Sequence, residues 1–168
     1  MGLNPKKSLS MKSQPKINPL IFETYLAVIK NSVGSKTWQN FYAKIDDRDT
    51  DILKNGDLSC AFFVSSILVM LNLLEKIHGT VAGVIFDLEK SGWQKTKKLK
   101  PGAVIVWVTK VDKKGESHKH LGFCLDKKTA ISNSSKTRKI AKHHLTFGTQ
   151  NGQPIRAIEA IYTHKKLN

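Results

Sequence analysis

The sequence predicts an α+β fold in which helices come first and an antiparallel sheet follows. Apolar stretches with helical spacing or length fill the first half of the chain, whereas short β-branched runs between charged turns fill the second half. The 168 residues are 40% hydrophobic, which is enough for one sizeable core. Residues 1–18 are polar, rich in lysine and interrupted by proline, so we expect a disordered basic tail there and a single domain over residues 19–168.

Four helical segments are expected. The first spans residues 19–34, from a proline that suits a helix start to a glycine that ends it. A short helical piece over residues 38–45 is followed by an acidic loop. Residues 58–77 are almost continuously apolar, and their length favours a buried helix over a strand. The last helix spans residues 80–92, with a threonine as its cap and a glycine at its end.

Strands are expected in the second half of the chain. Residues 103–108 form a β-branched run after a Lys-Pro-Gly turn, and residues 119–126 form the next strand. A tight connection leads to residues 130–134, the return strand of a hairpin. Residues 155–162 form the last strand. The sheet is therefore expected to be an antiparallel meander that packs against the helices.

A cysteine at the start of the long apolar helix is the most informative single residue. Ser59 is expected as the N-cap, which puts Cys60 in the first turn. Unpaired backbone N–H groups and the helix dipole stabilise a thiolate at that position. His120 follows 60 residues later on a short strand, and an imidazole beside a thiol completes a nucleophile and base pair. The two residues together predict a cysteine hydrolase.

Three motifs follow this cysteine in order. They are Pro-Gly-Ala-Val-Ile-Val-Trp at residues 101–107, His-Leu-Gly-Phe-Cys-Leu at residues 120–125 and Ala-Ile-Ser-Asn at residues 130–133. Their order resembles that of the papain-like cell-wall peptidases and amidases of the NlpC and CHAP kind, over roughly residues 55–135. The resemblance implies a papain-like fold in which the nucleophile helix packs on an antiparallel sheet.

The resemblance also implies roles for individual residues. Cys60 is the nucleophile, His120 is the base, and a polar residue on the following strand orients the imidazole. That third role falls to Asn133 or Ser132. We prefer Asn133, because its side-chain carbonyl can accept a hydrogen bond from the imidazole Nδ1–H. No metal or organic cofactor is required.

The choice between these two residues depends on the register of a hairpin. If residues 127–128 form a two-residue loop, Gly122 faces Asn133 and Asn133 shares a face with His120. An odd-numbered loop or a bulge moves Ser132 to that face instead. The sequence leaves both registers open.

These roles imply a peptidase or amidase that acts through an acyl-enzyme on peptidoglycan or a related peptide amide. The backbone N–H of Cys60 would help to stabilise the oxyanion. We expect the Cys60 and His120 pair to hold the thiol ionised. Cys60 should then react with alkylating reagents faster than a free thiol at mildly acidic pH.

Two other functions stay open. The 28 lysines and arginines outnumber the 13 aspartates and glutamates, and the net charge of +15 favours contact with an anionic polymer such as nucleic acid, a membrane surface or an acidic wall glycan. A basic nucleic-acid-binding protein is one alternative, although no recognition motif supports it. A catalytically inactive papain-like interaction domain is the other, because Ser59 stands where the family usually has aspartate.

The histidines offer a weaker alternative. His118 and His120 alternate on a strand and so face the same way, and they could bind a metal together with His143 and His144. Zinc sites usually show further closely spaced ligands, which favours the hydrolase. Cys124 lies in mid-strand between two apolar residues and is expected to be structural.

The remaining features concern the compartment. Only two cysteines are present, so disulfides are not expected to hold the fold. No apolar run reaches the length of a membrane span, and residues 1–18 lack the apolar block of a secretory signal. These features predict a cytoplasmic protein by default, or one exported by a non-classical route.

Overall fold

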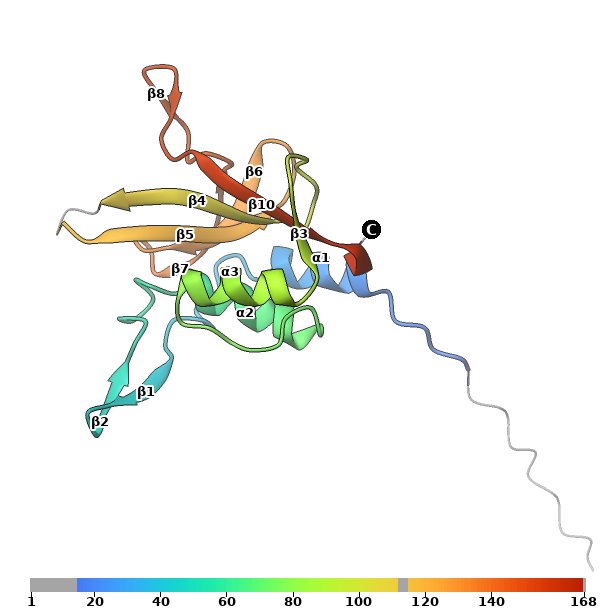
Figure 1. Ribbon diagram of the computed structural model, residues 1–168, viewed down its shortest axis with the longest axis horizontal. Coiled ribbons are helices and arrows are strands. Elements are labelled where there is room, and N and C mark those ends of the chain that lie inside the picture. The colour runs from blue at the N-terminus through green and yellow to red at the C-terminus, as the bar shows by residue number, and fades with distance from the viewer. Residues whose placement is uncertain (1–14, 112–114, 168) are drawn as a thin grey trace, which may run out of the picture.

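The computed structural model describes residues 15–111 and 115–167. Over these residues the chain is an α+β domain with three α-helices and a six-stranded antiparallel sheet, and the helices gather on one side of the sheet (Figure 1). This confirms the predicted class. Of the predicted tail, residues 1–14 lie outside the described part, and residues 15–18 are exposed and belong to no helix or strand.

Two of the four predicted helices are confirmed and one is shorter than expected. The three helices are α1 (Ile21–Asn31), α2 (Cys60–Met70) and α3 (Val81–Lys90). The Thr80 side chain caps α3 by accepting a hydrogen bond from the Gly83 N–H, at 3.2 Å. The apolar run continues beyond Met70, but α2 ends there because the following backbone turns into the left-handed region at Asn72, with φ 54°. No helix of the described residues is long and apolar enough to cross a membrane.

The helix predicted over residues 38–45 is wrong, since residues 38–41 belong to no helix and the first strand of a projecting β-hairpin occupies the second half of this stretch (Figure 1). It consists of β1 (Tyr42–Ile45) and β2 (Arg48–Asp51). Asp46 and Asp47 connect the strands with φ values of 47° and 60°. Two successive left-handed residues make the tight turn that matches the twist of a hairpin, and aspartate tolerates this conformation.

The sheet has the strand order β3-β10-β4-β5-β6-β7. Its four predicted strands are confirmed, with small shifts at their ends. Strands β3 and β7 were not expected, because their sequences are polar and lack a continuous β-branched run. The strands are β3 (Trp93–Thr96), β4 (Val104–Val111), β5 (Ser117–Cys124), β6 (Thr129–Ser134), β7 (Lys139–His144) and β10 (Ile158–His164). The described residues also form a small hairpin of β8 (Thr149–Gln150) and β9 (Gln153–Pro154) and a short 3-10 helix, η1 (Lys165–Leu167).

Aromatic rings join the helices to the sheet. The Phe123 ring on β5 makes edge contacts with Phe63 of α2 and Tyr25 of α1, with centroid distances of 5.4 and 5.7 Å. The fully buried hydroxyl of Tyr25 donates to the Gly102 carbonyl at 2.7 Å. A second cluster covers the opposite face of the sheet around Trp107, whose indole N–H donates to the Leu145 carbonyl at 2.8 Å. The sheet is therefore packed on both faces.

β5 and β6 are paired only near the turn that joins them. Their ladder covers three pairs, and Gly122 opposite Ser132 is the outermost. Both strands continue beyond this pair, β5 toward Ser117 and β6 toward Ser134. The start of α2 lies against this region, since α2 contacts both strands. An odd number of residues lies between Cys124 and Ala130, the pair next to the turn. The hairpin therefore has the register that puts Ser132, not Asn133, opposite Gly122.

Gly122 is required at this pair because no side chain fits there. A Cβ atom on Gly122 would lie 2.6 Å from the Ile131 carbonyl oxygen and 2.6 Å from the Ser132 Cβ. We therefore expect Gly122→Ala to lower the free energy of unfolding by about 1–3 kcal/mol, the usual cost of overpacking. Urea denaturation measures this change.

Gly79→Ala is a matched control for this prediction. Its new Cβ would meet only the end of the Ile52 side chain, at 3.0 Å, which can move aside. Equal stability of the two variants would contradict the close approach of β5 and β6.

Candidate active site

Cys60 is the first residue of α2 and is only 9% exposed. The backbone N–H groups of Leu121, Ala61 and Cys60 itself donate toward its sulfur. Ser59 occupies the N-cap position, as expected, but its hydroxyl makes no capping bond and has no hydrogen-bond partner in the described structure. The predicted N-cap position of Ser59 is therefore confirmed, although its side chain takes no part in capping. The backbone N–H groups at the helix start therefore face the sulfur, where they favour negative charge.

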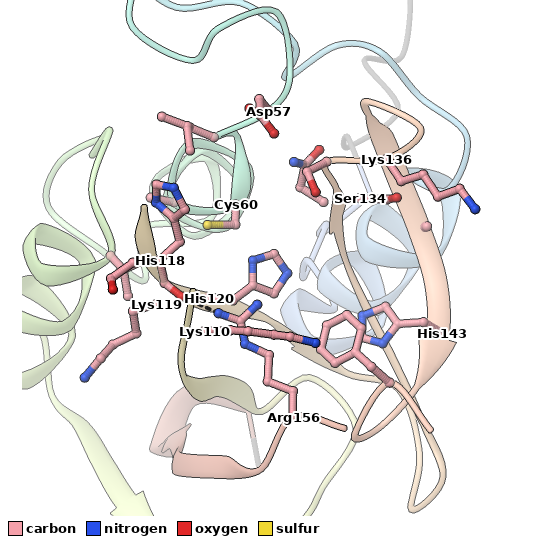
Figure 2. A pocket seen from close by; sticks show the side chains of 18 of the residues that line it. Asp57, Cys60, Lys110, His118, Lys119, His120, Ser134, Lys136, His143 and Arg156 are labelled. Carbon is pink, nitrogen blue, oxygen red and sulfur yellow. Dashed lines mark hydrogen bonds between the residues drawn. The ribbon is translucent and has the colours of Figure 1, made fainter. Parts of the chain in front are cut away.

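His120 approaches the same pocket from the other face of the sheet. It is paired with Trp107 across β4 and β5, and the two rings lie 5.5 Å apart. Trp107 belongs to the core cluster on the face away from the helices, whereas Cys60 belongs to the cluster beneath them. The thiol and the imidazole both line one pocket, next to the part of β5 and β6 that is not paired. Figure 2 shows both side chains in the pocket, with the Arg156 guanidinium beside them.

A chain of hydrogen bonds fixes the orientation of the His120 ring. Nε2 of His120 lies 2.9 Å from the Ser132 hydroxyl, which lies 2.8 Å from Nε2 of His143. Nδ1 of His143 lies 2.8 Å from the His144 carbonyl oxygen, which can only accept. A neutral His143 must therefore carry its proton on Nδ1 and accept the Ser132 hydroxyl proton on Nε2. The Ser132 oxygen then accepts from His120, whose proton sits on Nε2 and whose Nδ1 is free to act as a base.

Aromatic rings hold His143 in place. Its ring stacks on Phe147 with a centroid distance of 4.1 Å and an interplanar angle of 16°, and it lies 5.6 Å from the Trp107 ring. Burial lowers the pKa of His143, which favours the neutral form that the hydrogen-bond chain requires. His143 was expected at most to take part in the weaker metal alternative, because β7 itself was not expected.

The preference for Asn133 as the partner of His120 is wrong. Asn133 points away from the imidazole, and its Nδ2 donates to the Gly56 carbonyl at 2.8 Å. The physical reason is the hairpin register, which gives Ser132 and His120 the same face of the sheet. Asn133 instead ties the end of β6 to the loop that leads into α2, and so it positions the segment that carries Cys60.

The electrostatics of the pair oppose the expected ion pair. Burial raises the pKa of the Cys60 thiol, and the surrounding N–H groups and Arg156 offset this only in part. Burial, together with the charge of Arg156, lowers the pKa of His120 to about 3, and His143 would add to this effect if it were protonated. A thiol with a raised pKa and an imidazole with a lowered pKa rest as a neutral pair at neutral pH. His120 is then an unprotonated base rather than an imidazolium.

The pocket that contains both residues has a volume of about 790 Å³. The start of β5, the end of β6 and the start of α2 supply much of its wall. Arg156, just before β10, also lines it, and its positive charge acts on both Cys60 and His120. Nothing in the sequence distinguished Arg156 from the other 27 lysines and arginines.

The other candidate residues have structural partners. His118 lies 3.2 Å from the Glu116 carboxylate. No group of three or more histidine, cysteine or acidic side chains is placed to hold a metal within the described ranges, which speaks against the metal alternative. Cys124 is buried and donates to the Asp126 carbonyl at 3.3 Å, and burial together with Asp126 raises its pKa to about 11. Cys60 and Cys124 are both free thiols.

Comparison with known proteins gives no independent assignment. No protein-family model, curated protein or solved structure matches the chain. The candidate site therefore rests on its own geometry.

The neutral pair predicts the pH dependence of thiol reactivity. We expect the rate of iodoacetamide alkylation at Cys60 to show no reactive plateau between about pH 4 and 6, and to rise at a higher pH than for an ordinary cysteine. In His120→Ala the alkylation rate should still rise at alkaline pH, where the thiol ionises by itself. At neutral pH the rate should be lower than in the wild type, because the base that assists the reaction is missing. Peptide mass spectrometry separates Cys60 from Cys124. A plateau at acidic pH that disappears in His120→Ala would instead establish an ion pair.

The hydrogen-bond chain predicts different effects for the two neighbouring residues of β6. Ser132→Ala removes the acceptor of the His120 Nε2 proton, so nitrogen NMR of the histidine rings should show that the Nε2–H tautomer is no longer dominant. Asn133→Ala should leave that tautomer unchanged and lower the free energy of unfolding by about 1–3 kcal/mol, because the buried Gly56 carbonyl loses its donor. The reverse pattern would return the orienting role to Asn133.

Proposed function

We propose that the chain is a cysteine-dependent hydrolase with a papain-like fold, a peptidase or amidase that cleaves a peptide amide such as one in peptidoglycan. The observation that carries this proposal is that Cys60 and His120 line the same pocket. The oriented imidazole, with Nδ1 unprotonated, supports it further. The resemblance of the motifs to NlpC and CHAP hydrolases supplies the substrate class.

The proposed reaction begins with a neutral pair. As Sγ of Cys60 attacks the amide carbonyl, Nδ1 of His120 takes the thiol proton. The N–H groups of Cys60 and Ala61 at the start of α2 stabilise the charge that develops on the carbonyl oxygen. The amine leaves with the proton from His120, and a water molecule then hydrolyses the thioester with the same histidine as base. With a pKa of about 3, His120 stays unprotonated at neutral and mildly acidic pH.

Ser132 and His143 support the histidine while it is charged. When His120 gains a proton on Nδ1, its Nε2–H remains bound to the Ser132 hydroxyl. The hydroxyl is in turn polarised by Nε2 of His143. A hydrogen bond to the charged form favours it, so this chain partly offsets the burial that disfavours an imidazolium.

A second candidate is a papain-like domain that binds ligands without cleaving them. Two observations favour it: the pKa of Cys60 is raised, and no hydrogen bond joins its sulfur to the His120 ring in the part of the chain described. Catalytic hydrogen bonds are often longer before substrate binds, so the same geometry is compatible with a hydrolase. The two candidates differ in turnover.

Turnover is tested by incubating the full chain with purified peptidoglycan and with a peptide library, and by identifying released products by mass spectrometry. We expect product release that falls by about a thousandfold or more in Cys60→Ala and in His120→Ala. Cys124→Ala is the matched control and should keep the activity, because Cys124 lies outside the pocket wall. Products that survive Cys60→Ala would contradict the proposal, and a folded wild-type chain without turnover would favour the binding domain.

A further inference from the structure

Arg156 is the one guanidinium in the pocket wall as described, and its partners are all neutral. Its Nε donates to the Val108 carbonyl at 2.9 Å, and its Nη2 donates to the His118 carbonyl. A bulge in β4 beyond Trp107 and the open start of β5 supply these two carbonyls. The two bonds hold the guanidinium fork from one side and leave its other N–H groups without a described partner.

The position of Arg156 relative to the reacting pair is set by this anchoring. Its charge acts on the Cys60 thiol and on the His120 imidazole. Figure 2 shows the guanidinium in the pocket beside His120. A group bound to it would therefore lie next to a carbonyl that Cys60 attacks.

The rest of the pocket does not neutralise this charge. Asp57 is the one carboxylate among the described lining residues, and the other charged side chains of the wall are cationic: Lys110, Lys119 and Lys136. Lys119 forms an ion pair, at 2.6 Å, with Glu159, which is not one of the lining residues. A half-buried guanidinium without an anionic partner carries a desolvation cost that a bound anion would relieve.

We propose that Arg156 binds a carboxylate of the substrate, close to the carbonyl that Cys60 attacks. The planar fork of a guanidinium matches the two oxygens of a carboxylate, and such pairs are the stronger and more directional kind of hydrogen bond. The inference rests on the proposed hydrolase function and adds to it a substrate class: acyl compounds that carry a carboxylate near the scissile amide. Arg156 is in this role a specificity residue.

Two reagents of nearly the same shape test this inference at the thiol. Iodoacetate and iodoacetamide both alkylate sulfur with loss of iodide, but only iodoacetate carries a carboxylate. The measurement is the ratio of their rate constants at Cys60, read by peptide mass spectrometry. We expect this ratio to be higher in the folded wild-type chain than at the same cysteine in urea, and to fall by about tenfold in Arg156→Gln, as the loss of a charge-assisted contact predicts.

Matched variants separate a local contact from general attraction to a basic protein. Lys136→Gln removes a charge from the opposite part of the pocket wall, and Lys165→Gln removes one from the exposed end of the chain. Both should change the ratio by less than about twofold, because screened charges act weakly. Arg156→Lys should keep part of the preference for iodoacetate. A ratio equal to that of the unfolded chain, or an equal fall in Lys136→Gln, would overturn the inference.

A binding measurement keeps this inference separable from the proposed hydrolase activity. In Cys60→Ala, the NMR signal of the Arg156 Nε–H should shift saturably on titration with N-acetylglycine and remain unchanged with its amide. This experiment needs no reactive thiol. Saturable binding to a chain whose Cys60 proves unreactive would support the carboxylate site while the hydrolase fails, and no shift with N-acetylglycine would overturn the carboxylate site whatever the reactivity of Cys60.

Discussion

The early end of the ladder between β5 and β6 is the constraint on which the candidate site depends. Cys60 comes from the helix side of the sheet and His120 from the other side, so a continuous ladder would keep them apart. Gly122 and Ser132 form the last pair, and beyond it the backbone N–H of Leu121 faces the Cys60 sulfur. The Leu121 N–H, which would otherwise form a hydrogen bond within the sheet, thus points toward the thiol.

The direction of the hydrogen-bond chain originates in the backbone. The His144 carbonyl cannot donate, and this single fact determines the proton positions on His143, Ser132 and His120 in turn. The rings of Trp107 and Phe147 pack against His143, and its burial lowers its pKa and so favours the neutral form. Fixed orientation and neutrality together provide an imidazole with a free Nδ1, which is what a thiol needs for proton transfer.

The parts of the site that are encoded locally could be predicted from the sequence. Cys60 was singled out at an expected helix start and His120 on an expected strand, and the structure places them in α2 and β5. The choice between Ser132 and Asn133 depended on the parity of one loop, and a one-residue difference exchanges the two faces of a strand. Arg156 could not be predicted, because its role comes from a bulge and from two carbonyls distant in the chain, neither of which has a sequence signature.

Ser132 occupies a position with an unusual chemical requirement, since its oxygen must accept from one histidine while its proton goes to another. Among uncharged side chains of this size only a second hydroxyl, that of threonine, does both with a single atom. A change at His143 would remove the nearer acceptor of the Ser132 proton and leave it only the Asn133 carbonyl, at 3.5 Å, and a change at Ser132 would leave both rings unjoined. Positions 132 and 143 are therefore coupled, and apart from threonine at position 132, sequences that diverge from this one are expected to replace both residues together.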